Sequence, residues 1–280
     1  MKKLLAIAVL FGALTANAQE EKKEEPKEGW KRNGNISFLF NQSAFNNWLA
    51  GGTNNISGTI GLNYDFNYTK GDWTWDNKLI ASYGLTKLKG EEMKKTDDRL
   101  ELNSLAGKKA GGNWYYSAFL NFKTQMSSTY TEDGIQTSHF FSPAYFQFGP
   151  GMLWKKHDNL KVNIAPATSK VILVHGHLTE TGEAFGVAQG ETTRYELGAA
   201  LNAYYKLDVM KNVSVENILN LYSNYLEEFQ NVDIDYTVNV VMKVNKYLSA
   251  NLSMQTIYDD NAFEGFQTRE VFGLGINYGF

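Results

Sequence analysis

The sequence predicts an antiparallel transmembrane β-barrel of about twelve strands, with short periplasmic turns and longer extracellular loops. Three observations lead to this prediction: a first segment built like a signal peptide, long stretches of alternating apolar and polar residues, and an aromatic, glycine-rich last segment. Aromatic residues make up 14% of the chain, yet the mean hydropathy is slightly negative. That combination is typical of strands with one apolar and one polar face.

The first eighteen residues have the three parts of a signal peptide. Lys2 and Lys3 provide a positive start, residues 4–14 an apolar stretch, and Ala-Asn-Ala at 16–18 a cleavage site. The apolar stretch is too short to cross a bilayer as a helix, and no later segment reaches the ~18 apolar residues that a spanning helix needs. We therefore expect residues 1–18 to be removed, and the alternative is an uncleaved anchor.

Residues 19–32 are the predicted periplasmic linker to a barrel at 33–280. The first ten of them, QEEKKEEPKE, are nearly all charged and cannot bury enough apolar surface to become ordered. The chain contains no cysteine, which excludes a lipid-anchored lipoprotein, disulfides and metal–thiolate sites. A net charge of −3 gives no reason to expect a nucleic-acid partner.

Apolar and polar residues alternate along the chain at the period of a β-strand. In residues 56–68 the even positions carry isoleucine, leucine, tyrosine and phenylalanine, and the odd positions carry mainly serine, threonine, asparagine and aspartate. The pattern returns at 114–126, 195–207 and 232–244. These segments exceed the roughly five or six residues of a soluble strand and suit a tilted membrane strand. A soluble barrel is the alternative that strand length leaves open.

Twelve strands are expected, joined by connections that alternate between short and long, with both ends of the barrel in the periplasm. Pro150 and Pro166 fall inside strands, and because proline cannot donate to a strand ladder we expect bulges there. The predicted strands lie near residues 34–42, 55–69, 73–87, 97–108, 113–126, 139–155, 160–174, 191–207, 213–226, 232–245, 247–259 and 268–280.

Two groups of aromatic and apolar residues are expected to act at the membrane, one as an interface girdle and one as an assembly signal. Trp73, Trp75, Trp114 and Trp154 lie close to predicted short turns, where they would form a girdle at one interface with outer-membrane lipid. Ordinary core packing is the alternative for these tryptophans. The last strand resembles the terminal signal that the barrel-assembly machinery reads, and its apolar residues are Phe272, Leu274, Ile276, Tyr278 and Phe280.

Five short motifs, taken in their order along the chain, carry a family resemblance. They are NWLAGG at 47–52, WDNKL at 75–79, DRLELNS at 98–104, KTQ at 123–125 and SPAY at 142–145. In this order they resemble a Bacteroidota family of exported proteins known only as a domain of unknown function (number 3078). The resemblance covers most of the mature chain and implies an outer-membrane location. It brings no activity and no catalytic residues.

The charged residues of the strands fall on the inward face in equal numbers of acids and bases. Such a balance argues against a strongly ion-selective channel. Opposite charges would either pair across strands and plug the lumen, or segregate on opposite walls and leave a path for water. The expected lumen-lining residues are Asp76, Lys78, Arg99, Glu101, Lys123, Arg194, Glu196, Glu216, Asp233, Asp235, Lys243 and Arg269.

No familiar catalytic motif occurs in the sequence, and the motifs searched include G-x-S-x-G, H-E-x-x-H, the P-loop and G-x-G-x-x-G. His175 and His177 are the only histidine pair with ligand-like spacing, and Asp259 and Asp260 are predicted at the same rim. No third group is fixed beside them. We therefore expect no enzyme, no cofactor and no metal.

The function that these observations favour is a monomeric outer-membrane barrel that passes or binds a small solute. The first alternative is a structural or partner-binding barrel with a plugged lumen, and the second is a hydrolase at the rim. Residues 47–52 either fold into the lumen or form a packed turn. The long loop at 175–190 is either a recognition loop or a flexible surface loop.

Overall fold

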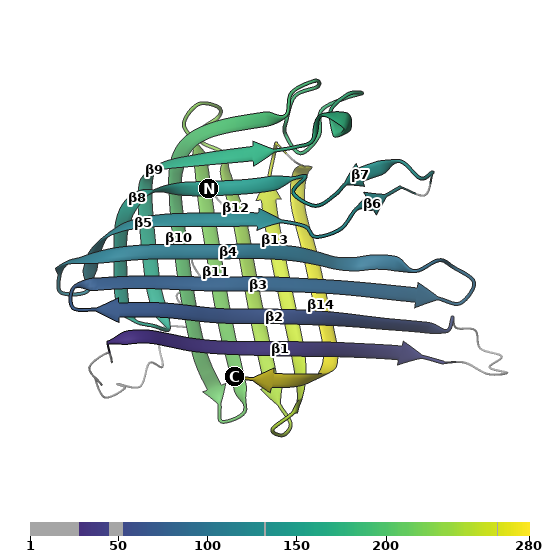
Figure 1. The fold of residues 1–280 in the computed structure, drawn as a ribbon, viewed down its shortest axis with the longest axis horizontal. Helices are drawn as coiled ribbons and strands as arrows, with labels where there is room; N and C mark the ends of the chain where they lie inside the picture. The colour runs from purple at the N-terminus through teal and green to yellow at the C-terminus, as the bar shows by residue number, and fades with distance from the viewer. Residues whose placement is uncertain (1–27, 45–52, 132, 262) are drawn as a thin grey trace.

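The computed structural model describes residues 28–44, 53–131, 133–261 and 263–280 (Figure 1). The predicted signal peptide at 1–18, residues 19–27 of the linker and the motif at 47–52 lie outside the described residues. Twelve antiparallel strands form one closed barrel, as the sequence predicts. They are β1 (Gly29–Ser43), β2 (Asn55–Lys70), β3 (Trp73–Leu88), β4 (Lys94–Gly111), β5 (Trp114–Thr124), β8 (Ala144–His157), β9 (Leu160–Leu173), β10 (Thr193–Met210), β11 (Val213–Asn224), β12 (Val232–Lys243), β13 (Leu248–Asp259) and β14 (Phe263–Gly279).

Each strand pairs with its neighbour along the chain, and β1 closes the barrel by pairing with β14. Short turns gather at one end of the barrel, at the left and bottom of Figure 1, and longer loops gather at the other end. The loop between β5 and β8 carries a two-stranded sheet of β6 (Thr129–Tyr130) and β7 (Gln136–Ser138). The 3-10 helix η2 (Gly176–Leu178) follows β9. Among the described residues, no helical segment has the length and apolar character needed to span a bilayer.

Strand β1 begins four residues before the predicted start of the barrel at residue 33. Residues Gly29 to Arg32 already pair with Thr69 to Phe66 of β2, so the predicted linker at 19–32 is too long at its end. This stretch is short and follows a densely charged segment, so its alternation of apolar and polar residues is hard to recognise in the sequence. Trp30 stacks on the ring of Phe66 and contacts the tilted ring of Tyr68, which holds the early residues in the sheet.

The two strand prolines lie in one irregular region, which confirms the expected bulges. Between the pairs Phe148–Ser169 and Met152–Ile164 of the β8–β9 ladder, three residues of β8 lie opposite four residues of β9. Pro150 and Pro166 both fall in this gap. On its other side β8 stays in register with β5, where Pro150 lies opposite Ala118. Strand β9 also shifts register against β10, where Pro166 and Ala167 oppose Ala199, so the irregularity affects both ladders of β9.

One predicted long connection, 260–267, is mostly strand. β14 begins at Phe263, with a register shift between Tyr258 and Asp259 of β13. The polar residues of this stretch suggested a loop, but pairing with β13 extends the strand through them. The connection between β13 and β14 is therefore short, although it lies at the long-loop end.

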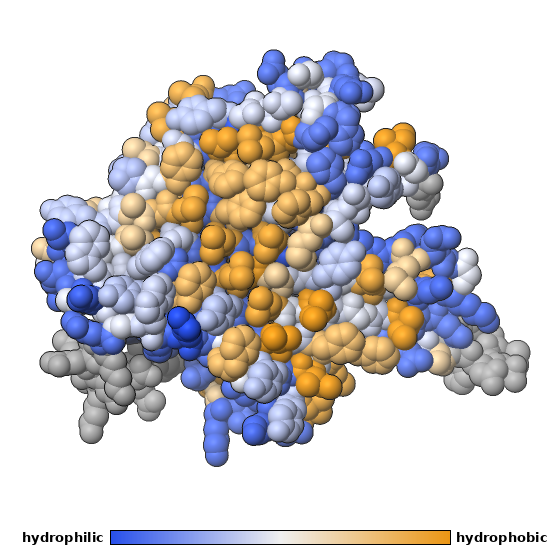
Figure 2. All heavy atoms as spheres, viewed as in Figure 1, coloured by the Kyte–Doolittle hydropathy of each residue, from blue (hydrophilic) through white to orange (hydrophobic). Residues whose placement is uncertain are grey.

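The outer surface of the barrel is apolar and its interior is polar. Five apolar residues, Phe272, Leu274, Ile276 and Tyr278 of β14 and Phe280 after it, each remain 55–60% exposed. Figure 2 shows a diagonal band of hydrophobic residues between two hydrophilic ends. By contrast, Glu101 and Glu196 inside the barrel are only 1% exposed. This distribution is the reverse of a soluble domain and is the one expected of a barrel that faces lipid.

Candidate functional site in the barrel interior

A network of ion pairs fills the interior of the barrel, and several of the pairs join strands that are not neighbours. We call this network the ion-pair belt. The pair that joins the most distant strands is Lys78 on β3 with Glu216 on β11, in which Nζ lies 3.0 Å from Oε1. Five strands separate β3 from β11 in either direction around the barrel, so this pair joins opposite walls. Lys123 on β5 pairs with Asp235 on β12, almost as far apart.

One tier of the belt lies near the short-turn ends of the strands. The carboxylate of Asp76 accepts hydrogen bonds from Nζ of both Lys155 and Lys161, at 2.9 Å each. Lys78 donates to Asp65 at 3.2 Å in addition to Glu216. The second oxygen of Glu216 accepts a hydrogen bond from the amide of Asn239, also across strands. These groups therefore neutralise one another within the lumen.

A second tier lies nearer the long-loop ends of the strands. Lys170 on β9 contacts three carboxylates, those of Asp233 at 2.9 Å, Glu196 at 3.4 Å and Asp259 at 3.5 Å. Arg269 on β14 pairs with Asp97 on β4, and Arg99 pairs with Glu101 on the same strand. Arg194 joins Glu196 at 2.9 Å and Glu227 at 2.8 Å.

The structure brings most of the predicted lumen residues into this network. Eleven of the twelve take part in ion pairs, and the twelfth, Lys243, lines a cavity of about 570 Å³. Sequence reasoning missed Lys170, although it is central to the second tier. The bulge at Pro166 shifts the alternation of β9, so Lys170 points inward where a regular strand would turn it outward.

Two cavities flank the Lys78–Glu216 pair on the short-turn side of the second tier. Their volumes are about 190 Å³ and about 570 Å³, and Lys78, Asp65, Asn33 and Lys206 line both. Asparagine amides dominate the walls of the smaller cavity, including Asn77, Asn103, Asn121, Asn163, Asn202 and Asn220.

Some of these asparagine side chains form hydrogen bonds with one another across neighbouring strands. Asn202 donates to Asn220 at 3.0 Å, in register with it on the neighbouring strand. In the larger cavity, the amide oxygens of Asn63 and Asn277 are buried and have no hydrogen-bond partner among the described residues. An amide provides both a donor and an acceptor, so the asparagines that line the two cavities complement a ligand with hydroxyl groups.

The tryptophans of the predicted girdle lie at the short-turn end. Trp73, Trp75 and Trp114 are between 42% and 54% exposed, and Trp114 lies opposite Trp154 on the neighbouring strand. Trp30 joins them, with its ring centroid 5.9 Å from that of Trp75. The sequence missed Trp30 because it lies inside the segment that was assigned to the linker.

At the long-loop rim, the structure separates the residues that the sequence placed together. Nδ1 of His177 lies 2.7 Å from Nδ1 of His175, and His139 lies beside both rings. Asp259 and Asp260 instead gather with Asp233, where Asp260 accepts a hydrogen bond from Asn231. The histidines and carboxylates thus form two groups and not one hydrolytic constellation.

Part of this chain is similar in sequence to a protein family of unknown function. The model of that family, described as a protein of unknown function (DUF3078), matches residues 40–130. Four of the five sequence motifs lie within this range, and SPAY at 142–145 lies beyond it. No curated protein matches the sequence.

Similar solved structures are distant in sequence. The translocator domain of autotransporter NalP from Neisseria meningitidis shares 10% identity, covering 100% of this chain and 95% of its own, with a TM-score of 0.36. The COG4313 outer membrane channel from Pseudomonas putida F1 shares 12% identity over 94% and 99% of the two chains, with a TM-score of 0.41.

Proposed function

We propose that the protein is an outer-membrane barrel that binds a small, uncharged polar solute in its lumen, behind ion pairs that close the lumen to free diffusion. The observation that carries this proposal is the Lys78–Glu216 pair, which joins opposite walls between two amide-lined cavities. A closed lumen with room for a ligand on the short-turn side suits binding better than open diffusion.

The apolar outer band and the tryptophans at the short-turn end support a membrane location. Trp30, Trp73, Trp75 and Trp114 are exposed on the outside of the barrel where an interface with lipid headgroups would lie. The predicted signal peptide and the exposed apolar face of β14 support export and recognition by the barrel-assembly machinery. The short turns would then face the periplasm and the long loops the outside.

The chemistry of the cavities indicates the class of solute. Lys78 pairs with both Asp65 and Glu216, so these charged groups already have partners within the protein. The asparagine amides that line the two cavities offer donors and acceptors, which hydroxyl groups complement. A small polyhydroxylated molecule therefore fits the asparagine-rich walls of this lumen.

A structural barrel with a plugged lumen is the second candidate function. It is favoured by the number of ion pairs in the long-loop tier, where Lys170 alone contacts three carboxylates. In that case the cavities would hold only water, and removing charges from the belt would destabilise the barrel without opening a path.

Swelling of proteoliposomes distinguishes the two functions. We define the belt-neutral variant as Lys78→Met, Glu216→Gln, Lys123→Met and Asp235→Asn together, which removes both of the widest pairs. Wild-type protein should give slow swelling in an isotonic pentose and in a tetrasaccharide. The belt-neutral variant should admit the pentose several-fold faster and still exclude the tetrasaccharide.

A matched control removes an ion pair outside the lumen, that of Lys94 with Glu91 (2.9 Å), through Lys94→Met and Glu91→Gln. It should swell at the wild-type rate. Replacing Asn63 and Asn277 by leucine in the belt-neutral variant should slow pentose entry. Rapid tetrasaccharide entry through the wild type would contradict the closed lumen, and a folded but impermeable belt-neutral variant would favour the structural function.

A further inference from the structure

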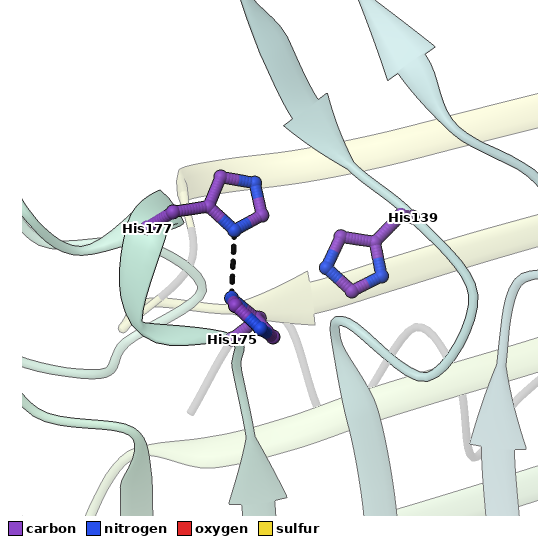
Figure 3. A group of neighbouring side chains, drawn as sticks. All are labelled: His139, His175 and His177. Atoms are coloured by element: carbon purple, nitrogen blue, oxygen red, sulfur yellow. Dashed lines mark hydrogen bonds between the residues drawn. The ribbon is translucent and has the colours of Figure 1, made fainter.

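Three of the four histidines of the chain meet at the long-loop end of the barrel (Figure 3). His139 follows β7, whereas His175 and His177 flank the start of η2, so the two segments are far apart in sequence. One nitrogen of each ring lies within 4.8 Å of those of the other two. Figure 3 shows the rings around a common space, with a nitrogen of His139 facing the other two rings.

The backbone holds these histidines in place before any ligand binds. His139 and Ser142 form an isolated bridge of two hydrogen bonds, at 3.0 Å and 2.9 Å. The hydroxyl of the fully buried Ser142 then accepts a hydrogen bond of 2.7 Å from the N–H of His175. The side chain of Thr179, also fully buried, donates to the carbonyl oxygens of Gly176 and Glu191 and fixes the end of η2.

The loop at 175–190 is packed at its base, against the expectation of a flexible surface loop. Val187 is fully buried against Ile172 and Val174 at the end of β9, and Phe185 packs on this cluster. The segment that carries His175 and His177 therefore has a fixed position relative to the barrel wall. A preformed site loses less conformational entropy when a ligand binds.

Hydrogen bonds outside the cluster decide which nitrogen of two rings is free. Nδ1 of His139 lies 2.8 Å from the carbonyl oxygen of Phe140, and Nε2 of His177 lies 3.1 Å from the side-chain oxygen of Gln136. Because an oxygen accepts in both cases, each of these nitrogens carries a proton. The lone pairs of the two neutral rings are then on Nε2 of His139 and Nδ1 of His177.

This arrangement is the one that metal-binding histidines use, since a ligand ring usually donates its other N–H to an oxygen. Nδ1 of His175 is the third ligand, at 2.7 Å from Nδ1 of His177. Without an ion, a proton on Nδ1 of His175 lies between the two atoms. With an ion bound to both Nδ1 atoms, His175 carries that proton on Nε2.

We propose that His139, His175 and His177 bind a divalent transition-metal ion of the zinc class, with a fourth position open to water. Imidazole nitrogen suits zinc, copper and nickel, whereas calcium and magnesium prefer oxygen. Zn–N bonds of about 2.0–2.1 Å require roughly 3.3 Å between tetrahedral nitrogens, which the distances of 2.7 Å and up to 4.8 Å bracket. The ion would fasten the loop after β7 to the loop after β9.

Zinc titration of the mature protein in detergent, purified without a histidine tag, tests the site. Calorimetry should show one Zn²⁺ per chain, and Mg²⁺ should give no signal. His139→Ala, His175→Ala and His177→Ala should each weaken binding at least tenfold, and Gln136→Leu should weaken it about tenfold through the loss of orientation. The matched control is His157→Ala, which changes the fourth histidine at the end of β8.

A second measurement uses the unmodified chain and so does not depend on the folding of variants. Diethyl pyrocarbonate modifies accessible imidazoles, and peptide mass spectrometry reports each site. Bound Zn²⁺ should protect His139, His175 and His177 and leave His157 reactive. Absence of saturable Zn²⁺ binding, equal weakening by His157→Ala, or equal protection of all four histidines would overturn the proposal.

Discussion

At the scale of single residues, the interior of this barrel contains buried charged side chains that are stabilised by oppositely charged partners. Asp76 is only 4% exposed, and both Lys155 and Lys161 donate to it. Removing a charge from water is costly, and its partners recover that cost only while the pairing is complete. The stability of the barrel therefore depends on individual carboxylates more than on their number.

Asp76→Asn should lower the free energy of unfolding by about 3 kcal/mol, because Lys161 then keeps no carboxylate and Lys155 keeps only Asp158. Urea unfolding in lipid vesicles measures this change. The control is Asp208→Asn, the same substitution at an exposed position near the end of β10, which should change stability by less than about 0.5 kcal/mol. Equal effects of the two variants would contradict the role of the interior network.

Much of this residue-level site could be predicted from sequence because strand alternation decides which charges face inward. Alternation could not say which charges meet, since Lys78 and Glu216 are brought together only by closure of the barrel. It also failed at Lys170, because a bulge changes the phase of its strand. His139 was missed for a related reason. It was assigned to a strand that in fact begins at Ala144.

At the scale of elements, each barrel strand presents one face to the interior and one to the surroundings. Sequence alternation predicted the number of strands and the location of the bulges correctly. The ends of strands were less predictable, because pairing with a neighbour extends β1 and β14 into polar stretches. Packing of the loop at 175–190 depends on contacts with β9 that no local pattern reveals.

Two exposed isoleucines test whether the outer face of the strands lies in a membrane. Ile60 on β2 is 54% exposed, and Ile135, beside β7 in the loop sheet, is 64% exposed. Ile60→Arg should destabilise the protein in lipid vesicles by about 2–4 kcal/mol, because it places a charge in hydrocarbon. Ile135→Arg should have little effect.

Urea unfolding of both variants in the same vesicles gives the comparison. In a soluble barrel, arginine at two such exposed positions would be tolerated equally. Similar small effects at Ile60 and Ile135 would therefore contradict a membrane-spanning β2. A loss confined to Ile60→Arg would support it.

At the scale of the whole molecule, the barrel combines an apolar exterior with an interior that is crossed by ion pairs. The belt joins walls that are distant along the chain, such as β3 with β11 and β5 with β12. In the proposed function these pairs both brace the barrel and block its lumen, while the amide-lined cavities remain on the short-turn side. The rim histidines lie at the opposite end and serve a separate site.

Single-channel conductance in a planar bilayer tests the closed lumen most directly. Folded wild-type protein should give no steady steps, whereas the belt-neutral variant should give salt-dependent steps with little preference between potassium and chloride, because its remaining lumen charges stay balanced. Heat-modifiable mobility on gels confirms that both proteins are folded. Steady wild-type steps as large as those of the belt-neutral variant would contradict the account, because the ion pairs would then not close the lumen.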